Sequence, residues 1–414
     1  MARDVRYVSL RSSDHVVVVG AGLAGWRFVE FLRRAHYDGA VTLIGDEPHA
    51  PYDRPPLSKQ VLAGRWEVEK TTLASAEKLA ESGATVLLGE RAVRLDVNDT
   101  AVELASGHRV EGTHVVIATG SRARPLSYPS SGPLMTLRSV DDAVRLHGVL
   151  AGLAPQSTIA IIGGGFIGAE AATSVKARGH VPVVLEVAER PLIAVLGDEV
   201  SHWLYPITRA AEIEVRTSQR VVDVADAPGG VTIEIEGGQR IEAAAVLAAV
   251  GSVVDTEWLA TSGLTIDGGV VVDRNFQAAP RVAAIGDVAK FPLAGVEGDE
   301  LVRIEHWQVA VEHAMELARF WTSDETSAPH MIPYFWSDQM GKKIQVLGHP
   351  HPSDDVNLVA GSLEEEKWLA LYSRRGLVTG LVALSNPRGL TKSRVLLETV
   401  TRLDDALALA PWSD

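Results

Sequence analysis

One pattern occurs twice in this chain and constrains its fold more than any other feature. A run of β-branched residues, Val16–Val19, is short enough for a buried parallel strand and leads directly into the glycine-rich stretch Gly20–Gly25. The same order returns at Ile159–Ile162 and Gly163–Gly168. In both halves an apolar helical stretch and a second strand follow. Each half therefore predicts a βαβ unit.

The glycines of both stretches have the spacing of a dinucleotide-binding turn. In such a turn the first glycine allows the tight bend, the second lets backbone N–H groups approach a pyrophosphate, and the third permits close helix–strand packing. The helix N-terminus then presents its partial positive charge to the phosphates. One GxGxxG match is weak, because glycines also serve ordinary turns, but two copies between a strand and a helix favour dinucleotide binding. Two dinucleotides, or one dinucleotide and a duplicated relic, fit this pattern.

The residue after each second strand indicates which nucleotide is bound. Glu186 follows the strand 183–185, and its carboxylate can accept hydrogen bonds from an adenosine ribose and would repel a 2′-phosphate. This favours NADH over NADPH at the later unit, with a solvated strand-end glutamate as the alternative. In the earlier unit the equivalent position is Gly45, so the next residue, Asp46, is the candidate ribose ligand.

Composition limits the chemistry that this chain can perform. Its 414 residues include no cysteine, which excludes disulfides, thiolate metal sites and a catalytic dithiol, so redox chemistry needs a bound cofactor. With 39 Lys and Arg against 53 Asp and Glu, the net charge is −14, which argues against nucleic acid or an anionic membrane as a partner. No apolar run approaches the roughly 18 residues of a membrane span. The first residues show no apolar signal core, and we expect a cytoplasmic protein without a metal site.

Two further strand-then-glycine segments, Val115–Gly120 and Val246–Gly251, indicate where the chain crosses between domains. The later βαβ unit lies between them. We therefore expect an α/β fold with two Rossmann-like dinucleotide-binding domains, one inserted in the other, followed by a C-terminal α+β domain. The expected boundaries are 14–121 with 255–330 for the first nucleotide domain, 122–254 for the inserted one, and 331–414 for the C-terminal domain.

Several longer blocks, taken together with these turns, resemble one known family. They are Pro51–Lys59 (PYDRPPLSK), Tyr334–Gln339 (YFWSDQ), Val41–Glu47, Gly163–Glu170, Ala284–Asp287 and Arg303–Trp307. The chain resembles the FAD-dependent NADH:ferredoxin reductases of the putidaredoxin reductase type, within the pyridine nucleotide-disulfide oxidoreductase superfamily. These flavoproteins serve cytochromes P450 and ring-hydroxylating dioxygenases. The resemblance runs from about His15 to at least Asn386.

The resemblance implies which residues bind FAD, in the first nucleotide domain, and NADH, in the inserted one. Val93 matches a backbone contact to adenine, Arg138 a contact to the flavin nucleotide, and Asp287 the carboxylate that binds the ribityl chain. The full set matched to FAD is Gly20, Gly22, Ala24, Gly25, Asp46, Arg54, Lys59, Val93, Ala118, Arg138, Asp287 and Trp307. The set matched to NADH is Gly163, Gly165, Ile167, Gly168, Glu170, Glu186 and Gly251.

Three of these residues are the expected catalytic residues. The resemblance places Lys59 beside the flavin, where an ammonium stabilises the anionic reduced ring. It places Glu170 at the nicotinamide site, as the counter-charge of Lys59, because a carboxylate near phosphates is unfavourable unless it is paired. The ring of Trp307 is expected to cover the flavin edge. Apart from the resemblance, a surface lysine, an ordinary helix carboxylate and a core tryptophan are the alternatives.

The expected reaction is hydride transfer from NADH to FAD, followed by two one-electron transfers to a small [2Fe–2S] ferredoxin. A rubredoxin reductase, an NADH oxidase and an NADH-responsive flavoprotein sensor of the apoptosis-inducing-factor kind remain alternatives. The sequence leaves open whether the chain is a monomer or a homodimer.

The docking site for the carrier is a separate expectation. Ferredoxins are usually acidic and this chain is acidic too, so docking requires a local cluster of cations. A scattered, solvated surface is the alternative. The candidate cations are Lys342, Lys343, Arg374, Arg375, Arg388, Lys392 and Arg394.

Overall fold

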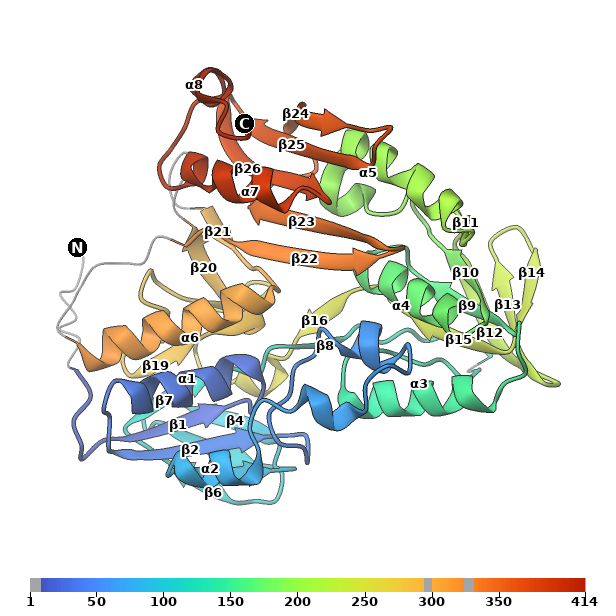
Figure 1. The fold of residues 1–414 in the computed structure, drawn as a ribbon. Coiled ribbons are helices and arrows are strands. Elements are labelled where there is room, and N and C mark those ends of the chain that lie inside the picture. The colour runs from blue at the N-terminus through green and yellow to red at the C-terminus, as the bar shows by residue number, and fades with distance from the viewer. Residues whose placement is uncertain (1–8, 131, 294–299, 324–330, 414) are drawn as a thin grey trace. The chain divides into compact units, whose positions relative to one another are not determined.

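The computed structural model describes residues 9–130, 132–293, 300–323 and 331–413 (Figure 1). The chain divides into two compact units. Unit 1 comprises Met1–Asp53, Thr72–Arg122 and Val253–Pro333, and unit 2 comprises Arg54–Thr71, Ala123–Ser252 and Tyr334–Asp414. The division into three domains stays a prediction, and its boundary at residue 330 and its last residue, 414, lie outside the described ranges.

Unit 1 is built on a six-stranded sheet in the order β18-β19-β7-β1-β2-β3. Strand β1 (His15–Val19) lies between β2 (Ala40–Gly45) and β7 (His114–Ile117) and is parallel to both. Its four valines are at most 3% exposed, and such an unbroken apolar run is typical of a parallel strand covered on both faces. The first predicted strand is thereby confirmed.

Two helices from distant parts of the sequence pack side by side in unit 1 (Figure 1). Helix α1 (Leu23–Arg34) follows the first glycine turn, and α6 (Trp307–Thr322) follows much later. The rings of Phe28 and Trp321 meet edge to face, with their centroids 5.6 Å apart. Strand β19 (Val282–Ala284) pairs in parallel with β7, so the predicted return of the chain to its first nucleotide-binding fold is confirmed.

Smaller elements complete unit 1, including the three-stranded sheets β4-β5-β6 and β17-β20-β21. Their bounds are α2 (Ala76–Glu81), β3 (Thr85–Leu88), β4 (Ala92–Asp96), β5 (Ala101–Leu104), β6 (Arg109–Glu111), η3 (Glu257–Leu259), β17 (Val270–Val271), β18 (Gln277–Ala279), η4 (Gly286–Val288), β20 (Ala289–Leu293) and β21 (Glu300–Val302).

Unit 2 contains the second βαβ unit. Strands β9 (Thr158–Ile162) and β10 (Val181–Leu185) are parallel and are joined by helix α4 (Phe166–Ala177). They lie in a four-stranded parallel sheet of order β11-β10-β9-β15. The predicted duplication is therefore present in the fold.

The C-terminal part of unit 2 is a five-stranded antiparallel sheet of order β22-β23-β26-β25-β24, drawn in orange and red in Figure 1. Helix α5 (Ile193–Ala210) packs against this sheet, and the hydroxyl of Tyr372 donates to the carbonyl oxygen of Leu196 at 2.7 Å. The helix is interrupted at Gly197, whose φ is 78° and whose added Cβ would lie 2.5 Å from the carbonyl oxygen of Pro352. The expected fold class, two Rossmann-like folds and a C-terminal α+β part, is confirmed.

The other elements of unit 2 are mostly short. Their bounds are η1 (Leu57–Val61), η2 (Val68–Thr71), α3 (Val140–Gly152), β11 (Glu214–Arg216), β12 (Val221–Ala227), β13 (Gly230–Ile235), β14 (Arg240–Ala243), β15 (Ala245–Ala248), β22 (Tyr334–Gln339), β23 (Lys342–Gly348), β24 (Asp355–Ser362), β25 (Lys367–Arg374), β26 (Leu377–Leu384), α7 (Pro387–Lys392), η5 (Ser393–Leu397) and α8 (Leu403–Leu409). The short strands β8 (Ser121–Ala123) and β16 (Ser252–Val254) lie where the chain passes between the units. Among the helices described, none is long and apolar enough to cross a bilayer.

Candidate functional site

The first glycine of each turn is required by its backbone. Gly20 has a φ of 116° and Gly163 a φ of 105°, which residues with a side chain rarely adopt. An added Cβ would lie 2.2 Å from the carbonyl oxygen of Ala118 at the first turn and 2.4 Å from that of Ala249 at the second. The two turns are thus constructed in the same way in the two units.

The third glycine of each turn allows the helix to approach the strand. A Cβ at Gly25 would lie 1.9 Å from the carbonyl oxygen of Gly20, and a Cβ at Gly168 would lie 2.0 Å from that of Gly163. The middle glycines differ, because a Cβ at Gly22 or Gly165 would meet nothing within 4 Å. Open space therefore lies at the start of both helices.

The helices after these turns begin without a side-chain cap. Helix α3 shows the ordinary arrangement, a capping box in which Ser139 and Asp142 satisfy the first N–H groups. Helices α1 and α4 instead have Gly22 and Gly165 as their N-cap residues, and no described side chain accepts from their first-turn N–H groups. Unused donors and open space at a helix N-terminus suit a phosphate. The residues present therefore fit a dinucleotide in each unit.

Carboxylates stand at both predicted ribose positions. Glu186 follows β10, and its two oxygens accept N–H bonds from Gly164 at 2.6 Å and Ala188 at 2.8 Å, which fixes the carboxylate beside the second turn. Asp46 is exposed directly after β2. Burial, and in smaller part the charge of Asp46, raise the pKa of Asp255 above its usual value.

In unit 1, polar groups surround Asp287, the residue that is predicted to bind the ribityl chain of FAD. The hydroxyl of Ser121 lies 3.2 Å from Asp287 Oδ2 and 3.2 Å from Glu305 Oε2. Arg303 bonds to the carboxylate of Glu305 and lies 3.3 Å from the carbonyl oxygen of Asp287. Sequence reasoning missed Ser121 and Glu305 as site candidates, although Glu305 lies in one of the blocks that carry the family resemblance.

Trp307 is held by a side chain from the PYDRPPLSK block. Its indole Nε1 donates to Oδ1 of Asp53 at 2.6 Å, within unit 1. Burial raises the pKa of Asp53, and the bond from Trp307 lowers it in part. The indole ring is therefore fixed in direction, and Asp53 is a second residue that the sequence did not single out.

Unit 2 brings the predicted residues Lys59 and Glu170 together. Lys59 Nζ lies 2.8 Å from Glu170 Oε2, and the glutamate is only 3% exposed. Two serines also donate to this carboxylate at 2.6 Å each, Ser58 to Oε2 and Ser337 to Oε1. The sequence predicted the ion pair but neither serine, and both stand inside quoted blocks, PYDRPPLSK and YFWSDQ.

The remaining predicted residues are placed within their own units. In unit 2 the guanidinium of Arg54 donates to the carbonyl oxygen of Arg138 at 2.7 Å. Of the others, Ala24 and Ala118 are buried, Val93 and Ile167 are exposed, and Gly251 has a φ of 90°. Because Arg54, Lys59 and Arg138 lie in unit 2 and the other FAD candidates in unit 1, their joint binding of FAD stays a prediction.

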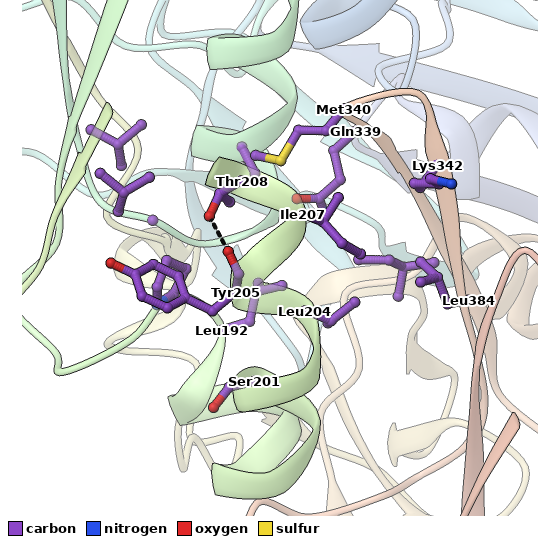
Figure 2. A pocket seen from close by; sticks show the side chains of 16 residues that line it. Leu192, Ser201, Leu204, Tyr205, Ile207, Thr208, Gln339, Met340, Lys342 and Leu384 are labelled. Carbon is purple, nitrogen blue, oxygen red and sulfur yellow. Dashed lines mark hydrogen bonds between the residues drawn. The ribbon is translucent and has the colours of Figure 1, made fainter. Parts of the chain in front are cut away.

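A pocket within unit 2 is too small for either dinucleotide (Figure 2). It lies between α5 and the β22–β23 hairpin, with mostly apolar lining residues such as Leu192, Leu204 and Ile207, and its cavity volume is about 30 Å³. Sites for cofactor-sized ligands usually need about 300 Å³ or more. In the described ranges no group of His, Asp or Glu side chains is suited to hold a metal ion.

Comparison with known proteins gives matches along nearly the whole chain. The model of the pyridine nucleotide-disulphide oxidoreductase family matches residues 14–314, and that of the reductase C-terminal domain matches residues 334–414. Rhodocoxin reductase from Rhodococcus erythropolis is 32% identical over 93% of this chain and 89% of its own length. The ferredoxin–NAD(+) reductase subunit of the benzene 1,2-dioxygenase system from Pseudomonas putida is 31% identical over 93% of both chains.

A solved structure agrees with these relatives. The covalent putidaredoxin reductase–putidaredoxin complex matches with a TM-score of 0.87 and 28% identity, over 94% of each chain. The resemblance seen in the sequence blocks is thus confirmed. The chain belongs to the pyridine nucleotide-disulphide oxidoreductase family, among the ferredoxin reductases that carry a reductase C-terminal domain.

Proposed function

We propose that this chain is an FAD-dependent NADH:ferredoxin reductase, which delivers single electrons to a [2Fe–2S] ferredoxin that feeds a cytochrome P450 or a dioxygenase. The observation that carries this proposal is the ion pair between the partly exposed Lys59 and the buried Glu170, which lies in the helix that follows the second of two matching dinucleotide turns. Relatives that match along nearly their whole length and are named as ferredoxin reductases support it.

The turns assign the two cofactors. Gly20, Gly22, Ala24 and Gly25 would hold the pyrophosphate of FAD at α1, and Gly163, Gly165 and Gly168 that of NADH at α4. When bound, FAD supplies the conversion from one two-electron donor to two one-electron transfers. Asp287, with Ser121 and Glu305 close by, presents acceptors suited to the ribityl hydroxyls.

Lys59 keeps one N–H bond available for a ligand. An ammonium has three donors; one of them reaches Glu170 at 2.8 Å and another the carbonyl oxygen of Pro55 at 3.3 Å. No other described group accepts from it. A fixed positive charge with one unused donor stabilises negative charge that develops on a reacting ring. Trp307, fixed by Asp53, would shield the reacting edge from water.

The coenzyme preference rests on Glu186. Its carboxylate is held by two backbone N–H groups, so it cannot turn away from a ribose bound at the second glycine turn. A 2′-phosphate would meet this negative charge, whereas a ribose hydroxyl would donate to it. NADH is therefore the proposed donor.

Stopped-flow absorbance tests the proposal. Purified holoenzyme should lose its flavin absorbance faster with NADH than with NADPH, and the reduced enzyme should then reduce a [2Fe–2S] ferredoxin within each turnover. A preparation without bound flavin would overturn the proposal as a whole, and faster reduction by NADPH would overturn the role of Glu186. Faster reduction of rubredoxin would identify a rubredoxin reductase, and slow transfer to either carrier would identify a sensor.

The cytoplasmic location stays part of this proposal. Fractionation of cells that express the chain would test it, since the protein should remain with the soluble cytoplasmic fraction.

A further inference from the structure

The carboxylate of Glu170, on α4, is bonded by side chains from two other segments of unit 2, η1 and β22. Oε2 receives the hydroxyl of Ser58, from η1, at 2.6 Å and the ammonium of Lys59 at 2.8 Å. Oε1 receives the hydroxyl of Ser337, from β22 of the C-terminal domain, at 2.6 Å. Ser58 is 3% exposed and Ser337 is fully buried, so both hydroxyls are shielded from bulk solvent.

The hydroxyl of Ser337 is committed to this role. A serine hydroxyl has one donor, and the amide Nε2 of Gln339 donates to its oxygen at 3.2 Å. The proton of Ser337 is therefore directed away from Gln339 and toward Glu170. Ser337 is the donor that the structure gives to Oε1, because Ser58 and Lys59 both reach Oε2.

A carboxylate held at one oxygen can rotate about its terminal bond, whereas one held at both oxygens cannot. Without Ser337, Oε1 would be buried and without its donor, and the carboxylate would turn to find another. Such a rotation would carry Oε2 away from Lys59. The position of the Lys59 ammonium therefore depends on a side chain of the C-terminal domain.

Strand β22 does not need Ser337 to stay in place. The backbone N–H of Met340 donates to the hydroxyl of Thr173, on α4, at 3.0 Å. The rings of Phe166 and Phe335 also pack edge to face, with their centroids 4.5 Å apart. A change at Ser337 thus removes the hydroxyl without releasing the strand.

We propose that Ser337 is a positioning residue for the hydride step, which fixes Glu170 and through it Lys59, so that the C-terminal domain completes the NADH site. The inference rests on the proposed function, in which the Lys59–Glu170 pair acts at that site. Ser337 touches neither cofactor in this role.

The test compares Ser337→Ala with a matched control, Ser373→Ala. Ser373 is also fully buried in the C-terminal sheet, but its hydroxyl has no hydrogen-bond partner among the described residues. With saturating NADH, S337A should reduce its flavin about tenfold more slowly, while its NADH dissociation constant stays near that of the wild type. S373A should match the wild type in both, and Ser337→Thr, which keeps a hydroxyl, should recover most of the rate.

A second readout needs no turnover. In urea unfolding of the holoenzyme, S337A and Glu170→Ala should be non-additive, because each removes the bond between Ser337 and Glu170, whereas S373A and Glu170→Ala should add. Should S337A not fold, Ser337→Cys fills the space of the hydroxyl with a much weaker donor and should show the same slow reduction.

The outcomes separate the two hypotheses. If Glu170→Gln is reduced by NADH at the wild-type rate, the proposed role of the ion pair is wrong. If Glu170→Gln is slow but S337A and S337C are as fast as S373A, the ion pair stands and the positioning role of Ser337 is overturned. Additive effects of S337A and Glu170→Ala on unfolding would also overturn it.

Discussion

His313 lies at the centre of the unit 1 core, beside the turn that carries Asp287. Its ring stands between Phe276 and Phe291, with centroid distances of 4.5 Å to each, and it is fully buried. Its Nδ1 accepts the N–H of Gly286 at 3.2 Å. The proton must therefore be on Nε2, which has no partner among the described residues. Burial lowers the pKa of His313 to about 3.

This histidine makes the stability of the protein depend on pH. Its folded pKa of about 3 lies below the unfolded value of 6.5, so between these values the unfolded chain binds more protons than the folded one. The free energy of unfolding should therefore fall as pH falls from about 6.5 toward 3. Replacement of His313 by Gln, which can still accept from Gly286, should flatten this part of the profile. Urea unfolding measured at several pH values checks the slope.

A matched control separates titration from lost packing. Leu317→Ala, one turn along α6 in the same core, should cost about 2–5 kcal/mol at every pH and leave the slope unchanged. An unchanged slope in His313→Gln would show that another group causes the acid sensitivity.

A second prediction for a single residue concerns the preference of Glu186 for NADH over NADPH. Glu186→Gln keeps an acceptor but loses the charge that repels a 2′-phosphate. The ratio of kcat/KM for NADH to that for NADPH should fall on the order of tenfold. Glu189→Gln, at a nearby exposed position, should leave the ratio unchanged. Equal ratios in the two variants would remove Glu186 from coenzyme selection.

At the scale of elements, the two glycine turns predict opposite effects for neighbouring positions. Gly22→Ala adds a Cβ that meets no protein atom, so the apoprotein should keep its stability or gain about 0.4–1 kcal/mol. The same Cβ occupies the space offered to phosphate, so FAD should bind more weakly. Gly165→Ala should weaken NADH binding and leave FAD bound.

A substitution at Gly20, the first glycine of the turn, should have the opposite effect on stability to one at Gly22. Gly20→Ala combines a φ of 116° with a Cβ 2.2 Å from the carbonyl oxygen of Ala118, so it should destabilise the apoprotein by more than about 1 kcal/mol. Flavin fluorescence gives FAD affinity, and urea unfolding gives stability. If Gly22→Ala binds FAD as tightly as the wild type, the open space at α1 has no binding role.

Sequence reasoning works for elements whose signal is local. The valines of β1 and the glycines after them define strand, turn and helix over about ten residues, because each acts through its own backbone or a neighbouring strand. The interruption of α5 at Gly197 is different. It depends on the carbonyl of Pro352, which is far away in the chain, and no periodicity within α5 reveals it.

In the candidate site, too, some residues could be predicted from the sequence, whereas others could be identified only from the fold. Lys59 and Glu170 could be predicted as a pair because the family resemblance places both near the flavin, and a carboxylate there needs a counter-charge. Ser337 could not, because a serine in a strand is ordinary until the fold places its hydroxyl at Oε1 of Glu170. Asp53 was equally hidden, since its bond to Trp307 joins residues from opposite ends of unit 1.

For the whole molecule, the net charge of −14 would repel an acidic ferredoxin. The surface cations that bind the carrier are therefore the main prediction that is still to be tested. Several candidate cations are already paired. Lys342 contacts Glu366 at 2.6 Å, Lys343 contacts Asp338 at 2.9 Å, and Arg374 bonds to Asp354 at 2.7 Å. The side chain of Asp354 is fully buried, so Arg374 has a structural role, and reversing its charge would damage the fold.

Arg375 and Arg388 are better probes of docking, because both are exposed. Changing both to glutamate should raise KM for an acidic ferredoxin and reduce its dependence on salt, while the rate of flavin reduction by NADH stays the same. Arg145→Glu, at an exposed position of α3, is the control. If KM and its salt dependence match those of the control, the carrier docks elsewhere.

The bond between Ser337 and Glu170 limits how freely the C-terminal domain can be exchanged. An engineer who wishes to couple this reductase to a foreign carrier would replace residues 334–414 with the domain of a relative. Such a chimera could bind its new carrier and still reduce it slowly, because its flavin would accept hydride from NADH slowly unless the grafted strand brings a hydroxyl to Oε1 of Glu170. Exchanging the C-terminal domain would thus change both the choice of carrier and the rate of flavin reduction by NADH.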